Sequence, residues 1–156
     1  MALDVRTAAV IRPVAIADRA PWAELFRGYR AFYQLEPDES VIGRVWDWLG
    51  DDSHEVSGFV AELDGVLVGL AHYSRFARPS SGSAGIYLDD LFTAPEARGC
   101  GVGRALLLKL RALAAAERRT VVRWITAEDN RTARRLYDSV ASPTPWITYD
   151  MAPVFH

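Results

Sequence analysis

The apolar and polar positions divide the first third of the chain into one strand and two helices. Residues 10–14 predict a short strand, which Pro13 confines to a sheet edge because proline cannot donate to a ladder. Asp18 suits the N-cap of a helix over residues 18–34. The apolar face of this helix is largely aromatic, which favours core packing, and comprises Trp22, Leu25, Phe26, Tyr29, Phe32 and Tyr33. Residues 38–49 predict a second helix.

Strand periodicity dominates the middle of the chain. Residues 58–63 and 66–73 are apolar runs on either side of Asp64-Gly65, which predicts a hairpin with both turn residues at positive φ. Residues 75–85 are rich in serine, proline and glycine and predict a mobile loop, either a substrate lid or an idle surface loop. An apolar strand follows over residues 86–92.

The C-terminal half alternates strands and helices. After the strand we expect a glycine loop at 98–103, a helix over 104–117, a strand over 121–126, a helix from Asp129 or Asn130 to about Ser139, and a last strand over 146–151. The order β-α-α-β-β-β-α-β-α-β predicts an α/β fold with a mixed sheet covered by helices. No repeat or linker divides the chain, so we expect a single domain over residues 1–156.

Composition and charge restrict the classes of function. The chain has 156 residues, 50% hydrophobic and 24% charged, which is typical of globular proteins. Its net charge of −2 provides no basic field for nucleic acid or anionic lipid. No apolar run approaches the roughly 18 residues of a membrane span. With a single cysteine, Cys100, and no signal-peptide pattern, we expect a soluble cytoplasmic protein with no nucleic-acid or membrane partner.

The glycine loop predicts an anion site. It follows a strand and opens a helix, whose first N–H groups lack internal partners and carry the positive end of the helix dipole. Glycines at 99, 101 and 103 let the backbone approach a ligand, and Arg98 and Arg104 flank them. Two solvated surface arginines are the alternative. A dinucleotide fingerprint needs glycine where Arg104 stands, and the phosphate loop of NTPases needs Gly-Lys-Ser/Thr, so both are excluded.

Two adjacent carboxylates, Asp89 and Asp90, stand in the apolar strand before this loop. Strand alternation predicts that they point to opposite faces. Burial and a neighbouring carboxylate raise a carboxyl pKa, the direction that a general base needs. The structural alternative is that both only accept hydrogen bonds, and His72 and Glu36 are further candidates for the base. The three histidines lie far apart and have no metal-ligand spacing, so we expect no metal.

Two separated motifs resemble the GNAT N-acetyltransferase family. The run Arg98-x-x-Gly101-x-Gly103 looks like the acyl-CoA motif of that family, within the longer and more specific stretch LDDLFTAPEARGCGVGRALL. The run Asn130-x-x-Ala133-x-x-Leu136-Tyr137 looks like its later helix signature. The resemblance covers residues 9–151 and is nearest to small-amine, polyamine and histone-acetyltransferase-like members. It implies the GNAT fold, a mostly antiparallel central sheet with helices on both faces. The family's Gly-Phe strand start is missing after the helix, so a shortened closing hairpin is expected.

The resemblance also implies the donor substrate and the site. It implies acetyl-CoA as the donor, with the pyrophosphate on the glycine loop and the pantetheine arm on the strand backbone. By position it implies Asp89 as the general base, Tyr137 as the general acid for the thiolate, and no catalytic role for Cys100. The implied donor-binding residues are Leu91, Phe92, Thr93, Arg98, Gly99, Cys100, Gly101, Val102, Gly103, Arg104, Asn130, Ala133 and Tyr137.

Three functions are compatible with these features. The leading hypothesis is direct transfer of an acetyl group to a primary amine, and acidic residues near the acceptor side favour a small cationic amine. The second is acetylation of a lysine or an N-terminus on a protein. The third is an acyl-CoA sensor or interaction module without catalysis, which predicts binding but no turnover. Dimers are common in the family, so a homodimer is expected.

Overall fold

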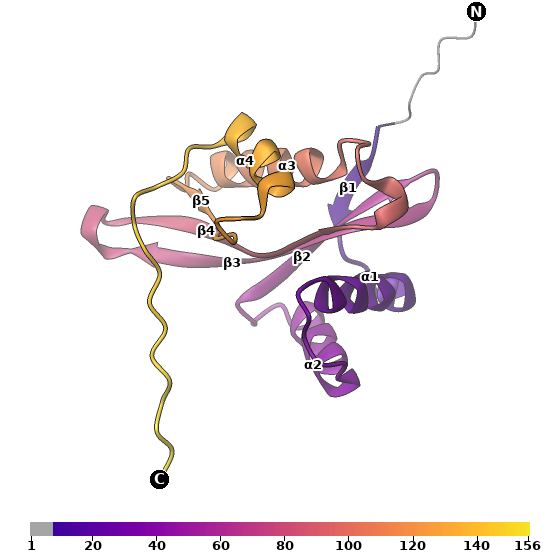
Figure 1. The fold of residues 1–156 in the computed structure, drawn as a ribbon, viewed down its shortest axis with the longest axis horizontal. Coiled ribbons are helices and arrows are strands. Elements are labelled where there is room, and N and C mark those ends of the chain that lie inside the picture. The colour runs from indigo at the N-terminus through magenta and orange to yellow at the C-terminus, as the bar shows by residue number, and fades with distance from the viewer. Residues whose placement is uncertain (1–7) are drawn as a thin grey trace, which may run out of the picture. The chain divides into compact units, whose positions relative to one another are not determined.

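A computed structural model describes residues 8–156, which form two compact units. The first unit ends at Ile125 and contains the sheet and three long helices, and the second runs from Thr126 to His156. Figure 1 shows the chain and labels its elements.

A five-stranded sheet of order β1-β2-β3-β4-β5 forms the centre of the first unit. The strands are β1 (Val10–Pro13), β2 (Val56–Leu63), β3 (Val66–Arg78), β4 (Ser83–Thr93) and β5 (Val122–Arg123). The first four are antiparallel to their neighbours, and β5 runs parallel to β4. The predicted mixed, mostly antiparallel sheet is therefore confirmed. Pro13 lies in the edge strand, as expected from its missing donor.

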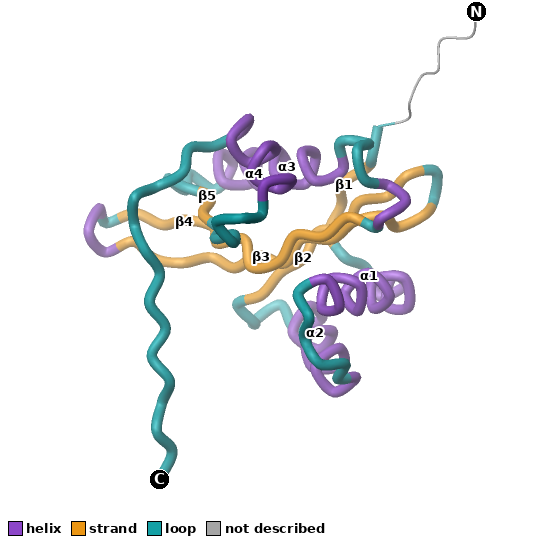
Figure 2. The backbone as a smooth tube through the Cα atoms, in the orientation of Figure 1, coloured by secondary structure: helices purple, strands orange, loops and turns teal. Residues whose placement is uncertain are grey.

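Helices cover both faces of the sheet, as predicted (Figures 1 and 2). Helices α1 (Arg19–Phe32) and α2 (Glu39–Gly50) cover one face, and α3 (Val102–Ala116) covers the other. Short 3-10 turns stand at Ile16–Asp18, Pro79–Ser81 and Pro95–Ala97. The core between the sheet and helices α1 and α2 is built mainly from Trp22, Leu25, Phe26, Ile42, Val45, Val60, Leu70 and Phe92. Most of these residues occupy the apolar stripes that the sequence predicts, so burial follows the hydrophobic pattern.

Asp18 holds the predicted position before α1, but its side chain does not cap the helix. Its two carboxylate oxygens accept hydrogen bonds from Arg12, at 2.6 and 2.9 Å, and one also accepts from the Ala15 amide. The hydrogen bond from Arg12 holds the pKa of Asp18 below its ordinary value. The carboxylate therefore ties β1 to the start of α1.

Two turn predictions had different outcomes. The hairpin at Asp64-Gly65 is confirmed, with φ of 49° and 79° at its two residues. The predicted mobile loop at 75–85 is wrong, because β3 and β4 continue through it as a regular ladder as far as Arg78 and Ser83. The aromatic ring of Phe76 packs over Gly85, where a Cβ atom would lie 2.6 Å from the ring. Cross-strand packing thus stabilises a hairpin here, although the serine, proline and glycine content is typical of a loop.

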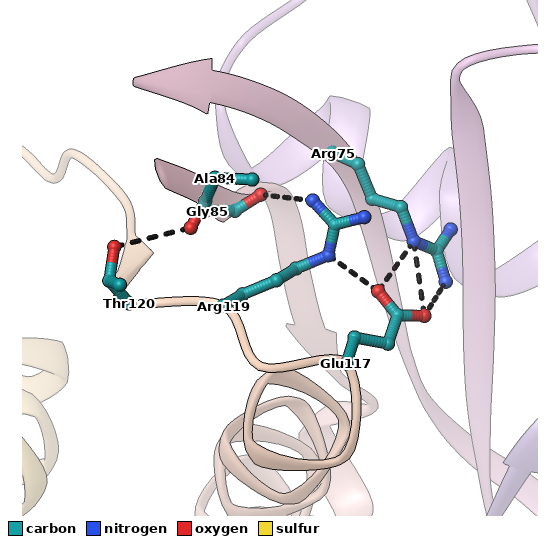
Figure 3. A network of polar contacts seen from close by, with 6 residues as sticks. All are labelled: Arg75, Ala84, Gly85, Glu117, Arg119 and Thr120. Carbon is teal, nitrogen blue, oxygen red and sulfur yellow. Dashed lines mark hydrogen bonds and ion pairs between the residues drawn. The ribbon is translucent and has the colours of Figure 1, made fainter. Parts of the chain in front are cut away.

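A polar network fixes the chain where it passes from α3 into β5 (Figure 3). Glu117 follows α3 and accepts hydrogen bonds from Arg75 of β3 and from Arg119. Arg119 also donates to the Gly85 carbonyl, and the Thr120 amide donates to the Ala84 carbonyl at 2.9 Å. These contacts place the end of α3 beside the hairpin and start β5 alongside β4.

The second unit contains α4 (Arg131–Val140) and a C-terminal segment without regular secondary structure. The predicted last helix is confirmed. The predicted strand over 146–151 is wrong, because a strand requires a ladder partner and this segment pairs with no strand of residues 8–156. Across those same residues, no helix is both long and apolar enough to span a bilayer.

Candidate active site

The parting of β4 and β5 creates an open strand edge. The two strands pair only at Ile86 with Val122 and at Tyr87 with Arg123. The predicted strand over 121–126 is thus shorter than expected. In the described chain, no strand pairs with this side of β4 from Leu88 to Thr93, a stretch that includes the predicted residues Leu91, Phe92 and Thr93. Backbone groups on such an edge can pair with an extended ligand.

The glycine loop ends at the N-terminus of α3, as the sequence predicts. Gly99 and Gly101 have φ of 80° and 79°, a region that glycine enters without strain, and both Cβ positions face open space. Helix α3 begins at Val102, so the amides of its first turn point toward the loop without intrahelical acceptors. Gly69 lets this turn approach the sheet, because a Cβ atom there would lie 2.7 Å from Val102. The loop and helix start fit an anionic group such as a pyrophosphate.

The side chains around the loop have different environments. Arg98 donates to the Thr93 carbonyl at 3.3 Å, and its guanidinium lies 5.5 Å from the Phe32 ring and 5.7 Å from the Phe92 ring. Arg104 is exposed on the first turn of α3, and Cys100 is an exposed free thiol. The Arg98 guanidinium therefore packs against aromatic rings of α1 and β4.

A β-bulge places both carboxylates on one face of β4. His72 pairs with Asp90 and Tyr73 pairs with Leu88, so Asp89 is an extra residue in β4. Ser74 donates a hydrogen bond to Asp89, and the His72 ring contacts Asp90. Since Ser74 and His72 are two residues apart on β3, they share a face, and so do the two carboxylates. The prediction of opposite faces is wrong, because the extra residue interrupts the alternation.

The environments of the two carboxylates differ. Partial desolvation raises the pKa of Asp89, and the charge of Asp90 adds to that rise against the hydrogen bond from Ser74. Burial alone would also raise the pKa of Asp90, but the hydrogen bond from His72 and the interaction with the Tyr29 hydroxyl hold it below its ordinary value. Asp89 is thus the better proton acceptor of the pair, and Asp90 the more persistent anion.

His72 belongs to a buried hydrogen-bonded chain that was not predicted from the sequence. The Trp22 indole N–H donates to His72 Nε2 at 3.0 Å, and His72 Nδ1 lies 2.8 Å from Asp90 Oδ2. Trp22 and His72 are 0% and 1% exposed. The available signal was a single histidine in the apolar run 66–73. The other candidate base, Glu36, is exposed in the segment between α1 and α2.

The remaining predicted residues belong to the second unit. Asn130 precedes α4 but its side chain does not cap it, and instead donates to Thr126 Oγ1 at 3.3 Å. Ala133 and Tyr137 are four residues apart on α4 and therefore share a side of that helix. Within residues 8–156, His, Cys, Asp and Glu side chains form no group of three that could hold a metal ion.

Comparisons with known proteins agree with this arrangement. A model of the Acetyltransferase (GNAT) family matches residues 21–141. The D-amino-acid N-acetyltransferase HPA3 of Saccharomyces cerevisiae is 26% identical over 142 residues, which cover 90% of this chain and 88% of the relative. A ribosomal-protein-alanine N-acetyltransferase from Brucella melitensis biovar Abortus 2308 has a TM-score of 0.79 at 20% identity, over 94% of this chain and 100% of that one. The aminoglycoside N-acetyltransferase AAC(6')-Iy, solved with a bisubstrate analogue, has a TM-score of 0.78 at 18% identity, with coverages of 95% and 100%. The names of these three proteins give three different classes of acceptor.

Proposed function

Because the chain belongs to the GNAT acetyltransferase family and is an acetyl-CoA-dependent N-acetyltransferase, we propose that its acceptor is a small cationic primary amine. The bulge in β4 carries this proposal, since it brings Asp89 and Asp90 to one face beside the open strand edge. Two carboxylates attract a positively charged amine and repel a substrate that carries its own carboxylate near the amine.

Acetyl-CoA, when bound, supplies the thioester carbon that the amine attacks. The residues proposed to hold it are those of the loop from Arg98 to Arg104, the β4 backbone at Leu91, Phe92 and Thr93, and Asn130 and Ala133 of the helix motif. The open φ region at Gly99 and Gly101 and the amides of the first turn of α3 support the loop assignment. Holding both reactants in line supplies much of the rate.

The proton transfers fall to two side chains in this proposal. Asp89 takes one proton from the acceptor ammonium, and the freed nitrogen forms the new C–N bond as the C–S bond breaks. Tyr137 gives a proton to the departing sulfur and is restored by the second proton that the nitrogen loses as the amide forms. The raised pKa of Asp89 supports its role. The role of Tyr137 rests on the helix motif Asn130-x-x-Ala133-x-x-Leu136-Tyr137.

The acceptor is tested by measuring free-thiol release from acetyl-CoA with a panel of amines. The panel contains polyamines, diamines and aminoglycosides, D-amino acids because of the relative HPA3, and a peptide with an N-terminal alanine. We expect a kcat/KM for the best polycation at least about tenfold above those for D-amino acids and the peptide, and a decline with increasing salt. A preference for the peptide or for D-amino acids would overturn the proposed acceptor class.

We also propose that the protein forms a homodimer. The C-terminal segment exposes six large apolar side chains, namely Trp146, Ile147, Tyr149, Met151, Val154 and Phe155. Large apolar side chains that are exposed and close together in the sequence favour burial against a partner. A second copy of the chain is the partner that is always present at matching concentration.

A further inference from the structure

We infer that Trp22 and His72 are positioning residues, which hold the Asp90 carboxylate in a fixed orientation for binding the ammonium group of the acceptor. This inference rests on the proposed transfer to an amine and extends it to the buried side of the site. It concerns a chain of hydrogen bonds that begins in the core between α1 and the sheet and ends at the bulge in β4.

The direction of this chain follows from the chemistry of its members. An indole N–H can only donate, so His72 Nε2 carries no hydrogen and accepts from Trp22. The hydrogen of the neutral ring therefore lies on Nδ1, which donates to Asp90 Oδ2. Trp22 thus selects the tautomer of His72 that presents a donor to the carboxylate.

Packing prevents the imidazole from turning away. The Phe26 ring stands edge-on to His72 at 5.0 Å and 84°, and the Trp22 ring lies at 5.7 Å. Trp22 itself packs against Phe26 and Trp46, with ring centroids 5.3 and 5.2 Å away. Because these rings are close-packed, the donor at Nδ1 keeps one direction.

Asp90 connects the buried chain to the acceptor side. Its side chain is 24% exposed, whereas that of His72 is 2% exposed. A carboxylate has about four lone-pair sites, so it can accept from His72 and still accept from a ligand N–H. The other charged or titratable groups that act on Asp90 are Tyr29, Arg30, Tyr33 and Asp89. An ammonium that binds Asp90 then lies beside Asp89, which accepts its proton.

The test compares His72→Phe, which keeps a ring but removes both hydrogen bonds, with His72→Asn, whose amide can still donate to Asp90. We expect His72→Phe to raise the KM for the amine at least about tenfold. The kcat at saturating amine and the Kd for acetyl-CoA should change less than about threefold, and His72→Asn should recover most of the KM. Tyr73→Phe is the matched control, since Tyr73 is the next residue of β3, points to the other face and stacks on Phe59. It should leave the KM for the amine unchanged.

A spectroscopic measurement covers the case in which His72→Phe fails to fold. In ¹⁵N-histidine-labelled protein at neutral pH, the His72 signal, assigned by its loss in His72→Asn, should show the Nδ1–H tautomer. Trp22→Phe, which removes the donor to Nε2 and changes the ring packing around His72, should raise the KM for the amine. An Nε2–H tautomer in the wild type, or an unchanged KM in every folded variant, would overturn the inference. Failure of the proposed acceptor class would appear differently, as a peptide or D-amino acid that is the best acceptor while the KM pattern of the His72 variants persists.

Discussion

Asp89 and Asp90 are consecutive residues of β4, yet both side chains lie on the same face of the sheet. One accepts a hydrogen bond from Ser74 and the other from His72, which occupy alternate positions of β3. Their pKa values shift in opposite directions, because partial burial and the charge of Asp90 raise that of Asp89, whereas the hydrogen bond from His72 outweighs burial and lowers that of Asp90. Paired titratable groups with opposite shifts are typical of a proton acceptor beside a fixed charge.

Asp89→Asn should lower kcat by about 10²-fold or more, because an amide cannot accept the proton of the ammonium. The base acts in its ionised form, so the wild-type kcat/KM should rise with pH through the pKa of Asp89, which lies above the ordinary aspartate value. The variant should lose this acidic limb. The measurement is a pH series of initial rates.

Asp64→Asn is the control for this prediction. It makes the same chemical change at an exposed turn residue with φ of 49°, a conformation that asparagine tolerates. It should retain both the rate and the pH profile. A normal acidic limb in Asp89→Asn would show that another group removes the proton.

The bulge explains which part of the site could be predicted from the sequence. The apolar pattern places both carboxylates in one strand, directly before a glycine loop and a helix. Their orientation depends on the register with β3, where Leu88 and Asp90 pair with consecutive residues. Register is a property of two strands together, so alternation within β4 gave the wrong faces. The contact of Trp22 with His72 depends instead on how α1 packs on β3, 50 residues later in the chain, which local pattern does not report.

Gly101→Ala should weaken acetyl-CoA binding by at least about tenfold, measured by calorimetry. The new Cβ would strain a residue with φ of 79° and would project into the open space beside the loop that we propose binds the pyrophosphate. Gly82→Ala is a matched control, because Gly82 also has a positive φ, of 60°, and open space around it, but lies at the far hairpin tip.

Both glycine variants should lose a similar stability of about 1–2 kcal/mol, the cost of the left-handed region for an L-residue. Only Gly101→Ala should lose affinity for acetyl-CoA. Equal affinities in the two variants would exclude the loop as the donor site.

Tyr137→Phe should lower kcat by about tenfold or more and leave the Kd for acetyl-CoA unchanged. The hydroxyl is the only group removed, so a proton donor is lost while the aromatic surface on α4 remains. Steady-state rates with the best amine, combined with calorimetry, measure the two quantities. A wild-type kcat would remove Tyr137 from the mechanism.

Glu117→Gln should destabilise the protein at neutral pH by about 1–2 kcal/mol, allowing for solvent screening. Hydrogen bonds from Arg75 and Arg119 lower the pKa of Glu117 from 4.5 to about 2. A carboxyl whose pKa is lower in the folded than in the unfolded protein stabilises the fold at pH values above its unfolded pKa. This stability is lost as the pH falls through the folded pKa. The difference in unfolding free energy between wild type and variant should therefore shrink between about pH 4.5 and pH 2.

Chemical denaturation at several pH values checks this dependence. Glu55→Gln, at an exposed residue before β2, should leave the unfolding free energy within about 0.5 kcal/mol of the wild type. A difference for Glu117→Gln that stays constant down to pH 2 would show that the network in Figure 3 does not act through this charge.

The C-terminal segment shows a second limit of local pattern. Residues 146–151 have the β-branched and aromatic composition of a strand, but no strand of residues 8–156 pairs with them. Composition indicates that a segment suits a strand once it has a partner strand. Whether such a partner exists depends on the rest of the fold. The hairpin at 75–85 is the converse case, in which cross-strand partners outweigh an unfavourable composition.

Deletion of residues 144–156 should convert the proposed dimer into a monomer. The deletion removes the exposed apolar side chains of the segment but ends beyond α4, whose last residue is Val140. Light scattering coupled to size exclusion would give a mass near twice 17.3 kDa for the full chain and a single-chain mass for the truncated one. A shorter deletion of residues 153–156, which leaves Trp146, Ile147, Tyr149 and Met151 in place, should retain a larger dimer fraction because more apolar area can still be buried. A full-length chain that remains monomeric at micromolar concentration, or a truncated chain that remains dimeric, would contradict the assignment of this segment to the interface.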